Sequence, residues 1–169
     1  MTPQRPWRAL VTAGGTREPI DDVRVVTNLS RGRFGAALAH ALAARGVEVT
    51  LLGSAELLRL PHGLDPRIRC VPFATFSDLA RELEVLIGGT PPDLLLLAAA
   101  VSDYSPIRSE GKIRSDADEL VVRMKRNPKL LSGLRERCGV GTFLVGFKRL
   151  SGVPHAELVA TALRQVRQE

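Results

Sequence analysis

The chain has 169 residues, enough for one domain with a sizeable hydrophobic core, and its 24 Lys and Arg against 18 Asp and Glu give a net charge of +6. Its few aromatic residues, one Trp, one Tyr and five Phe, do not alternate with the basic residues, which argues against nucleic-acid binding. The longest apolar run, residues 94–101, is too short to cross a bilayer and the first residues contain no signal-peptide core, so we expect a cytoplasmic protein that does not bind membranes.

Predicted strands and helices alternate along most of the chain. Short apolar runs predict strands, and apolar residues at helical spacing predict helices. The expected strands cover residues 8–13, 47–54, 68–73, 91–101 and 141–147, and the expected helices cover residues 32–45, 77–87, 128–137 and 155–169. This order predicts an α/β fold: a single Rossmann-like domain over residues 1–169 with a doubly wound, mostly parallel sheet.

Two segments interrupt the alternation. Residues 16–29 separate the glycine pair after the first strand from the first helix. Residues 105–126 show no helical period, and we expect them to form a protruding β-hairpin arm. Its two strands are expected at residues 112–115 and 119–125, on either side of a turn at residues 116–118.

Small residues after the first strand indicate an anion site, because ligands of open α/β sheets bind outside the carboxyl ends of the strands. Gly14 and Gly15 let backbone amides approach a ligand, and Gly32 opens the first helix, whose N-terminus favours phosphate. Ser30 is placed either to cap that helix or to donate to a phosphate. The alternative is that these glycines serve only the close packing of helix and strand.

A nicotinamide cofactor is not expected. The glycine spacing does not fit a G-x-G-x-x-G turn, and the second strand ends in "LLGS" without an acid for a ribose 2′-hydroxyl, so we do not expect NAD. A reductase of the short-chain type also lacks support, because Tyr104 is not followed by a lysine four positions later and the Tyr-x-x-x-Lys pair is therefore absent.

Further candidate residues follow the other strands or lie on the arm. Ala99 leaves room for a base at the end of the fourth strand, and Asp103 is suited to bind a ribose or a metal, or merely to end the strand in an Asx turn. Phe147 and Lys148 end the fifth strand, where an aromatic ring can pack on a base. Lys112, on the arm, can reach a phosphate charge, although most surface lysines are only solvated.

The histidines and cysteines form no catalytic or metal-binding pattern. His40, His62 and His155 are dispersed, and Cys70 and Cys138 lie far apart, so we expect free thiols and assign no residue to a metal. Catalysis is then expected to depend on positioning and charge stabilisation and not on a covalent nucleophile.

Six motifs occur in order along nearly the whole chain: "TAGGTREPID", "TNLSRGRFG", "AAAVSDY", "KIR", "MKRNPKLL" and "VGFK". Together they resemble the phosphopantothenate–cysteine ligases of coenzyme A biosynthesis, in the stand-alone bacterial form without a flavoprotein decarboxylase domain. The resemblance implies a Rossmann-like fold and a homodimer that pairs through the arm, residues 112–125. It also implies magnesium as the companion of the nucleotide, and no flavin.

The reaction implied by the resemblance uses CTP, 4′-phosphopantothenate and cysteine. The carboxylate of phosphopantothenate attacks the α-phosphate of CTP, giving an acyl-cytidylate and pyrophosphate, and the amine of cysteine then displaces CMP. Asn28 matches an asparagine near the acyl-phosphate intermediate, and Lys112 matches a lysine used in nucleotide binding and turnover. Both are therefore candidate catalytic residues.

The resemblance also assigns the nucleotide-binding residues. The two glycine loops and Ser30 match the triphosphate site, Ala99 and Asp103 fall in the cytosine and ribose segment, and Phe147 falls beside the base. The chain departs from the family at its end, because the family continues into a strand with an "AND"-type motif and this chain stops at Glu169. The alternative function is therefore a nucleotide-binding or regulatory paralogue or fragment without turnover.

Overall fold

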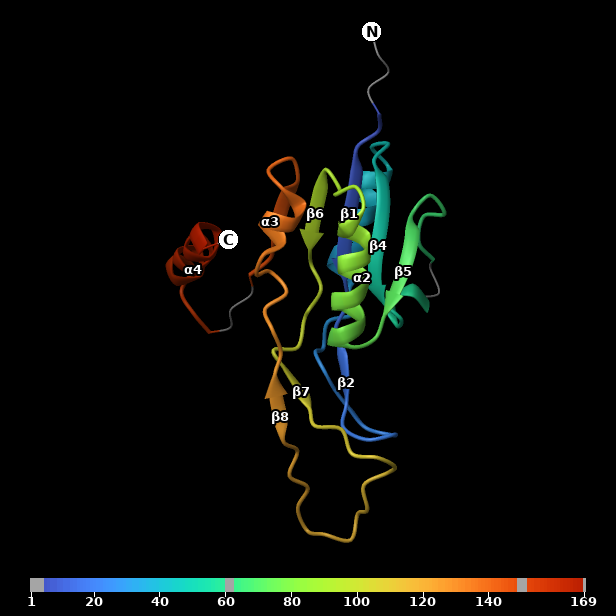
Figure 1. The fold of residues 1–169 in the computed structure, drawn as a ribbon, viewed down its shortest axis with the longest axis vertical. Helices are drawn as coiled ribbons and strands as arrows, with labels where there is room; N and C mark the ends of the chain where they lie inside the picture. The colour runs from blue at the N-terminus through green and yellow to red at the C-terminus, as the bar shows by residue number, and fades with distance from the viewer. Residues whose placement is uncertain (1–4, 60–62, 149–151, 169) are drawn as a thin grey trace.

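A central sheet of five parallel strands organises the molecule (Figure 1). The computed structural model describes residues 5–59, 63–148 and 152–168. In spatial order the strands are β5 (Arg69–Phe73), β4 (Glu48–Ser54), β1 (Arg8–Ala13), β6 (Leu94–Leu97) and β9 (Phe143–Gly146). The predicted α/β architecture with a doubly wound, mostly parallel sheet is confirmed.

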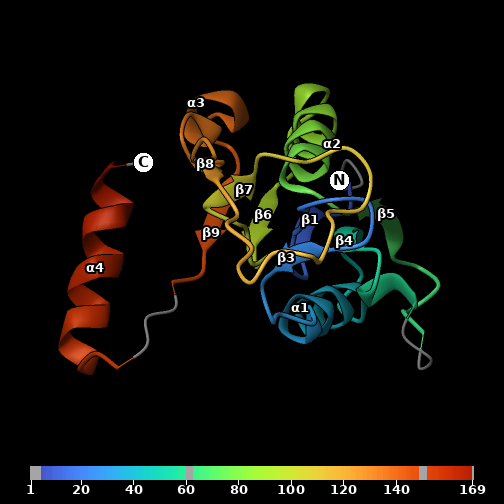
Figure 2. The same cartoon turned by 90° about the horizontal axis from the view of Figure 1, so that it is seen from below.

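Helices cover both faces of the sheet (Figure 2). One face carries α1 (Arg33–Ala43), and the other carries α2 (Phe76–Gly88) and the short α3 (Leu134–Cys138). A single 3-10 turn, η1 (Leu57–Arg59), follows β4, and α4 (His155–Gln168) lies beyond the β9 edge of the sheet. Among the described residues, no helix is both long and apolar enough to cross a lipid bilayer.

The core consists of two apolar layers, because successive side chains of each strand point to opposite faces. Leu10, Leu52 and Leu95 pack with Leu79 and Leu83 of α2 on one face. On the other face, strand side chains pack against α1. They include Ala9, Val11, Ala13, Val49 and Leu51. Each fully buried leucine contributes about 1.5–3 kcal/mol relative to an exposed one, so the sheet and its helices form one stable unit.

The helix boundaries differ from the predicted ones at two places. The N-cap of α1 is Gly32, at φ 73°, so Ser30 lies before the cap and does not fill that role. The predicted helix over residues 128–137 is wrong in its first half, since residues 130–133 form turns and α3 begins only at Leu134. Gly133, at φ 75°, has a left-handed backbone that an α-helix cannot continue.

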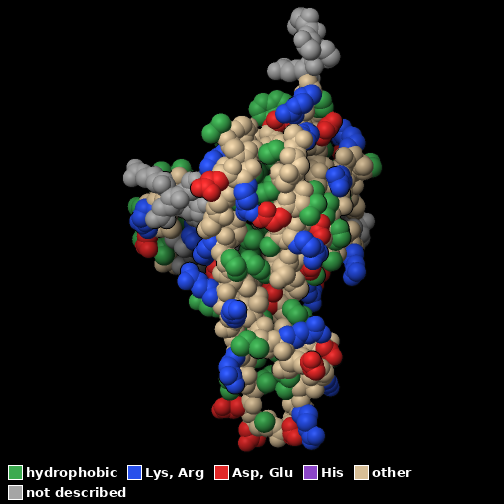
Figure 3. Space-filling view, in the orientation of Figure 1, with side chains coloured by type: hydrophobic (Ala, Val, Ile, Leu, Met, Phe, Trp, Pro, Cys, Tyr) green, Lys and Arg blue, Asp and Glu red, His purple; other side chains and the backbone are tan. Residues whose placement is uncertain are grey.

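The protruding arm is present, but its strands lie elsewhere than predicted. A short antiparallel pair joins β7 (Tyr104–Pro106) to β8 (Met124–Arg126), whereas residues 112–115 form no strand. A second antiparallel pair, β2 (Arg17–Pro19) with β3 (Val25–Thr27), lies in the long loop before α1 and was not predicted. In Figure 3 the arm extends from the end of the molecule opposite the N-terminus and carries both basic and acidic side chains.

Replacing Gly35 by Ala is expected to lower the free energy of unfolding. Gly35 lies in α1, where an added Cβ would be 2.5 Å from the Cβ of Ala13 and 3.1 Å from the carbonyl oxygen of Thr12. Overpacking costs about 1–3 kcal/mol, which exceeds the gain in helix propensity of at most about 1 kcal/mol. Urea unfolding measures the change. Gly88→Ala in α2 is the control, because its added Cβ meets no atom within 4 Å. Equal behaviour of the two variants would contradict the close seating of α1 on β1.

Candidate functional site

The loops that follow β1 and β6 lie side by side at the carboxyl end of the sheet. Ala100 N–H donates to the carbonyl of Gly14 at 2.8 Å, and Thr16 N–H donates back to the carbonyl of Ala100 at 3.2 Å. The chain continues from β1 to β4 on one side of the sheet and from β6 to β9 on the other side. The connections that leave the neighbouring strands β1 and β6 therefore run in opposite directions. This is the topological switch point, where doubly wound sheets bind their ligands.

The glycines after β1 pack tightly against the segment that precedes α1. A Cβ on Gly14 would lie 2.2 Å from Ser54 Oγ, one on Gly15 would lie 2.9 Å from the carbonyl oxygen of Asn28, and one on Gly32 would lie 2.8 Å from the amide nitrogen of Gly14. Close packing is therefore a sufficient reason for glycine at each position. Phosphate binding by the same amides stays a prediction.

Asn28 lies at the same edge of the sheet. Its side chain is exposed to solvent, and its Nδ2 donates to the carbonyl of Ala100 at 3.0 Å. The carbonyl of Ala100 thus receives hydrogen bonds from the loop after β1 and from the segment after β3. This carbonyl joins the segments of Gly14, Gly15 and Asn28 to the end of β6.

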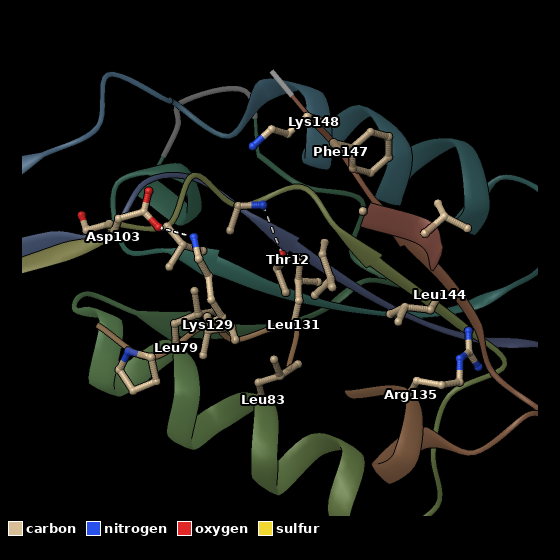
Figure 4. A pocket seen from close by; sticks show the side chains of 18 of the residues that line it. Thr12, Leu79, Leu83, Asp103, Lys129, Leu131, Arg135, Leu144, Phe147 and Lys148 are labelled. Carbon is tan, nitrogen blue, oxygen red and sulfur yellow. Dashed lines mark hydrogen bonds and ion pairs between the residues drawn. The ribbon is translucent and has the colours of Figure 1, made fainter. Parts of the chain in front are cut away.

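A cavity of about 370 Å³ opens beside these loops, between α2, α3, the ends of β6 and β9, and α4 (Figure 4). Its lining includes four of the predicted nucleotide-binding residues: Ala99, Asp103, Phe147 and Lys148. Six leucines also line the cavity: Leu79, Leu83, Leu97, Leu130, Leu131 and Leu144. In Figure 4, Phe147 and Lys148 lie across the cavity from Leu79 and Leu83.

The mouth of the cavity is charged. Asp103 Oδ1 accepts a hydrogen bond from Lys129 Nζ at 2.8 Å (Figure 4), and this bond lowers the pKa of the Asp103 carboxyl, with smaller contributions from the charges of Lys129, Lys148 and Arg126. Phe147 meets Phe34 of α1 edge to face, with ring centroids 4.9 Å apart. The mouth therefore combines one carboxylate, several cations and an aromatic ring.

A buried carboxylate, Glu18 on β2, connects the base of the arm to the body of the protein. Glu18 is 3% exposed; its Oε1 accepts from the N–H of Phe76 and its Oε2 from the hydroxyl of Ser105, each at 2.8 Å. Asn127 donates through Nδ2 to Ser105 Oγ at 2.9 Å and to the carbonyl of Ser102 at 2.8 Å. These bonds attach the base of the β7–β8 pair to the body of the protein.

A second buried carboxylate, Asp21, lies in the turn between β2 and β3. Burial alone would raise its pKa, but hydrogen bonds from the N–H groups of Val23, Ile113 and Arg24 and from the Arg24 guanidinium outweigh that effect and lower the pKa to about 2. Ile113 belongs to the arm and directly follows Lys112.

The cavity lining, over the part of the chain that the structure describes, includes neither Lys112 nor Asn28.

Sequence reasoning missed several residues of this region. Glu18 and Asp21 both lie in "TREPID", but nothing in the local sequence indicates that these carboxylates are buried. The sequence pattern also assigns no binding role to Asn127 or Lys129. Within the described residues, no group of three or more His, Cys, Asp and Glu side chains could hold a metal ion, and the cysteines there, Cys70 and Cys138, are free thiols as predicted.

Comparison with known proteins places the chain in a family. The model of the DNA/pantothenate metabolism flavoprotein C-terminal domain matches residues 5–166. The chain belongs to this family. The cavity, the glycine loops and the arm all lie inside the matched range, so they are parts of the family domain.

Relatives of this family domain include longer proteins. The coenzyme A biosynthesis bifunctional protein CoaBC of Thermococcus kodakarensis is 36% identical over 162 residues, which are 95% of this chain and 38% of that protein. The CoaBC protein of Escherichia coli is 34% identical over 144 residues, or 82% of this chain and 34% of that protein. The chain therefore spans little more than a third of the length of these curated relatives.

A solved structure confirms the fold of the family domain. The crystal structure of the DNA/pantothenate metabolism flavoprotein from Streptococcus pneumoniae aligns with a TM-score of 0.84 at 28% identity, over 95% of this chain and 77% of that one. The C-terminal domain of a CoaBC protein aligns with a TM-score of 0.72 at 29% identity, over 94% of this chain.

Replacing Glu18 by Ala is expected to destabilise the protein. The change leaves the N–H of Phe76 and the hydroxyl of Ser105 without their acceptor, and an unsatisfied buried donor costs about 1–3 kcal/mol. The loss of unfolding free energy is measured by urea denaturation. Glu119→Ala, at an exposed position of the arm, is the matched control and should leave the midpoint unchanged. If both variants unfold at the wild-type midpoint, the carboxylate of Glu18 does not support the fold.

Proposed function

We propose that the chain is a CTP-dependent phosphopantothenate–cysteine ligase of coenzyme A biosynthesis. The observation that carries this proposal is the meeting of the predicted nucleotide residues at one edge of the sheet: four line the cavity, and the glycine loops join the same edge through Ala100. The family membership and the coenzyme A biosynthesis names of the relatives support the assignment.

The cavity and its mouth suit a nucleoside triphosphate. We assign the base to the apolar cavity beside Phe147 and Ala99, and the ribose to the mouth beside Asp103. The triphosphate is assigned to the backbone amides at Gly14, Gly15 and residues 30–32, with Lys148 as a nearby cation. Helix N-termini and glycine-lined amides bind phosphate through free N–H groups and the helix dipole.

The chemistry is two successive displacements. A carboxylate oxygen of 4′-phosphopantothenate forms a bond to the α-phosphorus of CTP, and the bond to pyrophosphate breaks. The amine of cysteine then attacks the acyl carbon, CMP leaves, and the nitrogen loses a proton to give the amide. Both steps build negative charge on phosphate oxygens, which positioned donors stabilise.

Asn28 and Lys112 are the proposed catalytic residues. The Asn28 amide is assigned to hydrogen-bond the acyl phosphate, and the Lys112 ammonium to stabilise the charge of the nucleotide phosphates. Magnesium is proposed as the ion that CTP carries into the site as part of the substrate, and no step is assigned to it.

A nucleotide-binding module without turnover is the second candidate. It is favoured by the position of Lys112 on the arm, outside the cavity lining of the described residues. The two candidates differ in whether pyrophosphate is released.

The proposed ligase is tested by measuring pyrophosphate release with CTP, magnesium, 4′-phosphopantothenate and cysteine. Release is expected with the full mixture, together with CMP and the amide product, and omitting phosphopantothenate should abolish it. Replacing CTP by ATP tests the nucleotide preference. Saturable CTP binding without any pyrophosphate release would favour the binding module.

Lys112→Gln serves as the site variant in the same assay. Removing one positioned donor to a developing phosphate charge is expected to lower kcat roughly 100-fold or more, while the unfolding free energy of this exposed position changes by less than about 0.5 kcal/mol. Lys125→Gln, an exposed lysine of β8, is the control and should retain activity. A large fall in melting temperature with full activity would make Lys112 a structural residue.

We further propose a homodimer that pairs through the arm. Leu120, Val121 and Met124 expose 50%, 79% and 40% of their surface, and isolated two-stranded hairpins are only marginally stable in water. A second copy of the arm would cover these side chains by a self-complementary contact. Sedimentation velocity at micromolar concentration should therefore show a dimer that Val121→Asp dissociates. Val140→Asp, at a position that is 99% exposed and lies outside the arm, should leave the dimer intact. A monomeric wild-type chain contradicts this interface.

A further inference from the structure

The arm is attached to the body a second time, beyond its base. Residues 109–113 lie along the turn between β2 and β3, residues 20–24, where Figure 1 shows the two segments at the same end of the molecule. Ser109 N–H donates to the carbonyl of Ile20 at 2.9 Å, and Asp22 N–H donates to the carbonyl of Gly111 at 3.4 Å. We call these two segments, 20–24 and 109–113, the arm clamp.

Asp21 is the centre of the arm clamp. Its side chain is fully buried, and its Oδ1 accepts from the N–H groups of Val23 at 2.8 Å and Arg24 at 2.7 Å. Its Oδ2 accepts from Arg24 Nη1 at 2.6 Å and from the N–H of Ile113 at 3.1 Å. Arg24 Nη1 also donates to the carbonyl of Ile113 at 3.3 Å, so both peptide groups flanking Ile113 are held.

These contacts require a carboxylate. An ionised carboxylate is acceptor-only and has about four lone-pair sites, which match the four donors around Asp21. An amide of the same size would turn an NH₂ group toward at least two of these donors. Each buried donor without its acceptor is costly, so Asn at position 21 cannot satisfy all four donors of the clamp at once.

The arm clamp connects the two proposed catalytic residues. Lys112 directly precedes Ile113, whose N–H and carbonyl are bound by the clamp. Asn28 directly follows β3, the strand that leaves the clamp turn, and binds the carbonyl of Ala100 at the sheet edge. One small antiparallel element, β2 with β3, therefore holds Lys112 at its turn and presents Asn28 at its open end.

We propose that Asp21 is a positioning residue, which fixes the Lys112 segment of the arm relative to the Asn28 segment and so orients the Lys112 ammonium for turnover. This inference rests on the proposed ligase function. Asp21 itself touches no reacting group, because its oxygens are occupied by the four donors of the clamp. Its effect reaches the chemistry through the peptide of Ile113.

The test compares Asp21→Asn with Asp65→Asn in the full chain, by backbone amide hydrogen exchange and by ligase kinetics. Asp65 is a matched control, because its carboxylate also accepts from a backbone N–H and an arginine and also has a pKa of about 2. It lies before β5, and its partner Arg67 follows it by two residues, far from the arm in sequence.

Asp21→Asn is expected to raise the exchange rates of residues 109–113 roughly tenfold or more while the amides of β1, β4 and β6 stay protected. Its kcat should fall roughly 10- to 100-fold, since a misplaced catalytic group costs that much, with a smaller rise in the dissociation constant for CTP. Asp65→Asn should match wild type in all three measurements.

Three results with Asp21→Asn, and a fourth with the wild-type chain, would overturn the proposal. The first is unchanged exchange in residues 109–113 of Asp21→Asn. The second is accelerated exchange throughout the sheet, because Asp21 would then support the core and not the arm. The third is accelerated exchange of the arm with wild-type kcat. In the wild-type chain, the Ile113 amide must also exchange more slowly than the amides of residues 116–119, or the clamp does not form.

The exchange measurement separates this inference from the ligase proposal. If the wild-type chain binds CTP but releases no pyrophosphate, the ligase function fails, and the turnover role of Asp21 fails with it. The arm clamp would still be recognised by the protection of Ile113 and its loss in Asp21→Asn. If the wild-type chain turns over and both aspartate variants match it, the ligase function stands and Asp21 has no positioning role.

Discussion

The close approach of the chain at the carboxyl ends of β1 and β6 is the constraint on which the rest of the site depends. The carbonyl of Ala100 accepts from the N–H of Thr16 and from the Asn28 side chain, while Ala100 N–H binds the carbonyl of Gly14. Gly14 and Gly15 stand at this approach because an added Cβ would meet a neighbouring segment: Ser54 of β4 at Gly14, and the carbonyl oxygen of Asn28 at Gly15. The long segment between β1 and α1 extends away from the sheet at this point, and it forms the antiparallel pair of β2 with β3.

Two buried carboxylates attach the arm, which projects from that edge, to the body of the protein. Glu18 binds the N-terminus of α2 and the base of the arm, and Asp21 binds the arm farther out. A buried charge is tolerated only when hydrogen-bond donors replace the lost water, and both carboxylates have such donors. The donors come from peptide groups and from Ser105 and Arg24, so the orientation of the arm is built into the backbone of the fold. A site whose proposed catalytic lysine lies on an extended segment needs such support, because solvent-exposed β-pairs of three residues contribute little rigidity themselves.

The sheet could be predicted from the sequence because buried parallel strands are continuous apolar runs, and "LLLL" of β6 and "VTLLGS" of β4 are of this kind. The short antiparallel pairs could not be located, since three residues are too few to show a period of two. The prediction of a helix over residues 128–137 was wrong in its first half, because Gly133 has a left-handed backbone that separates the preceding turns from α3. The glycine loops and strand ends could be expected to meet at one edge of the sheet, because that reasoning follows from topology alone, and they do lie together there. Glu18 and Asp21 escaped it because their burial depends on donors such as Phe76 and Ile113, 58 and 92 residues away along the chain.

The ion pair between Asp103 and Lys129 also has a consequence for how the cavity responds to ionic strength. Both side chains are more than half exposed, and exposed pairs contribute at most about 1 kcal/mol to stability. In the proposed nucleotide complex, a ribose hydroxyl that binds Asp103 would therefore displace Lys129 at little cost, and the released ammonium would be a further cation beside Lys148 for the phosphates. Salt screens this pair and any attraction of the two lysines to phosphate alike. Ionic strength therefore acts on the charged mouth of the cavity through charge screening, whereas the leucine wall behind it contributes contacts that do not depend on charge.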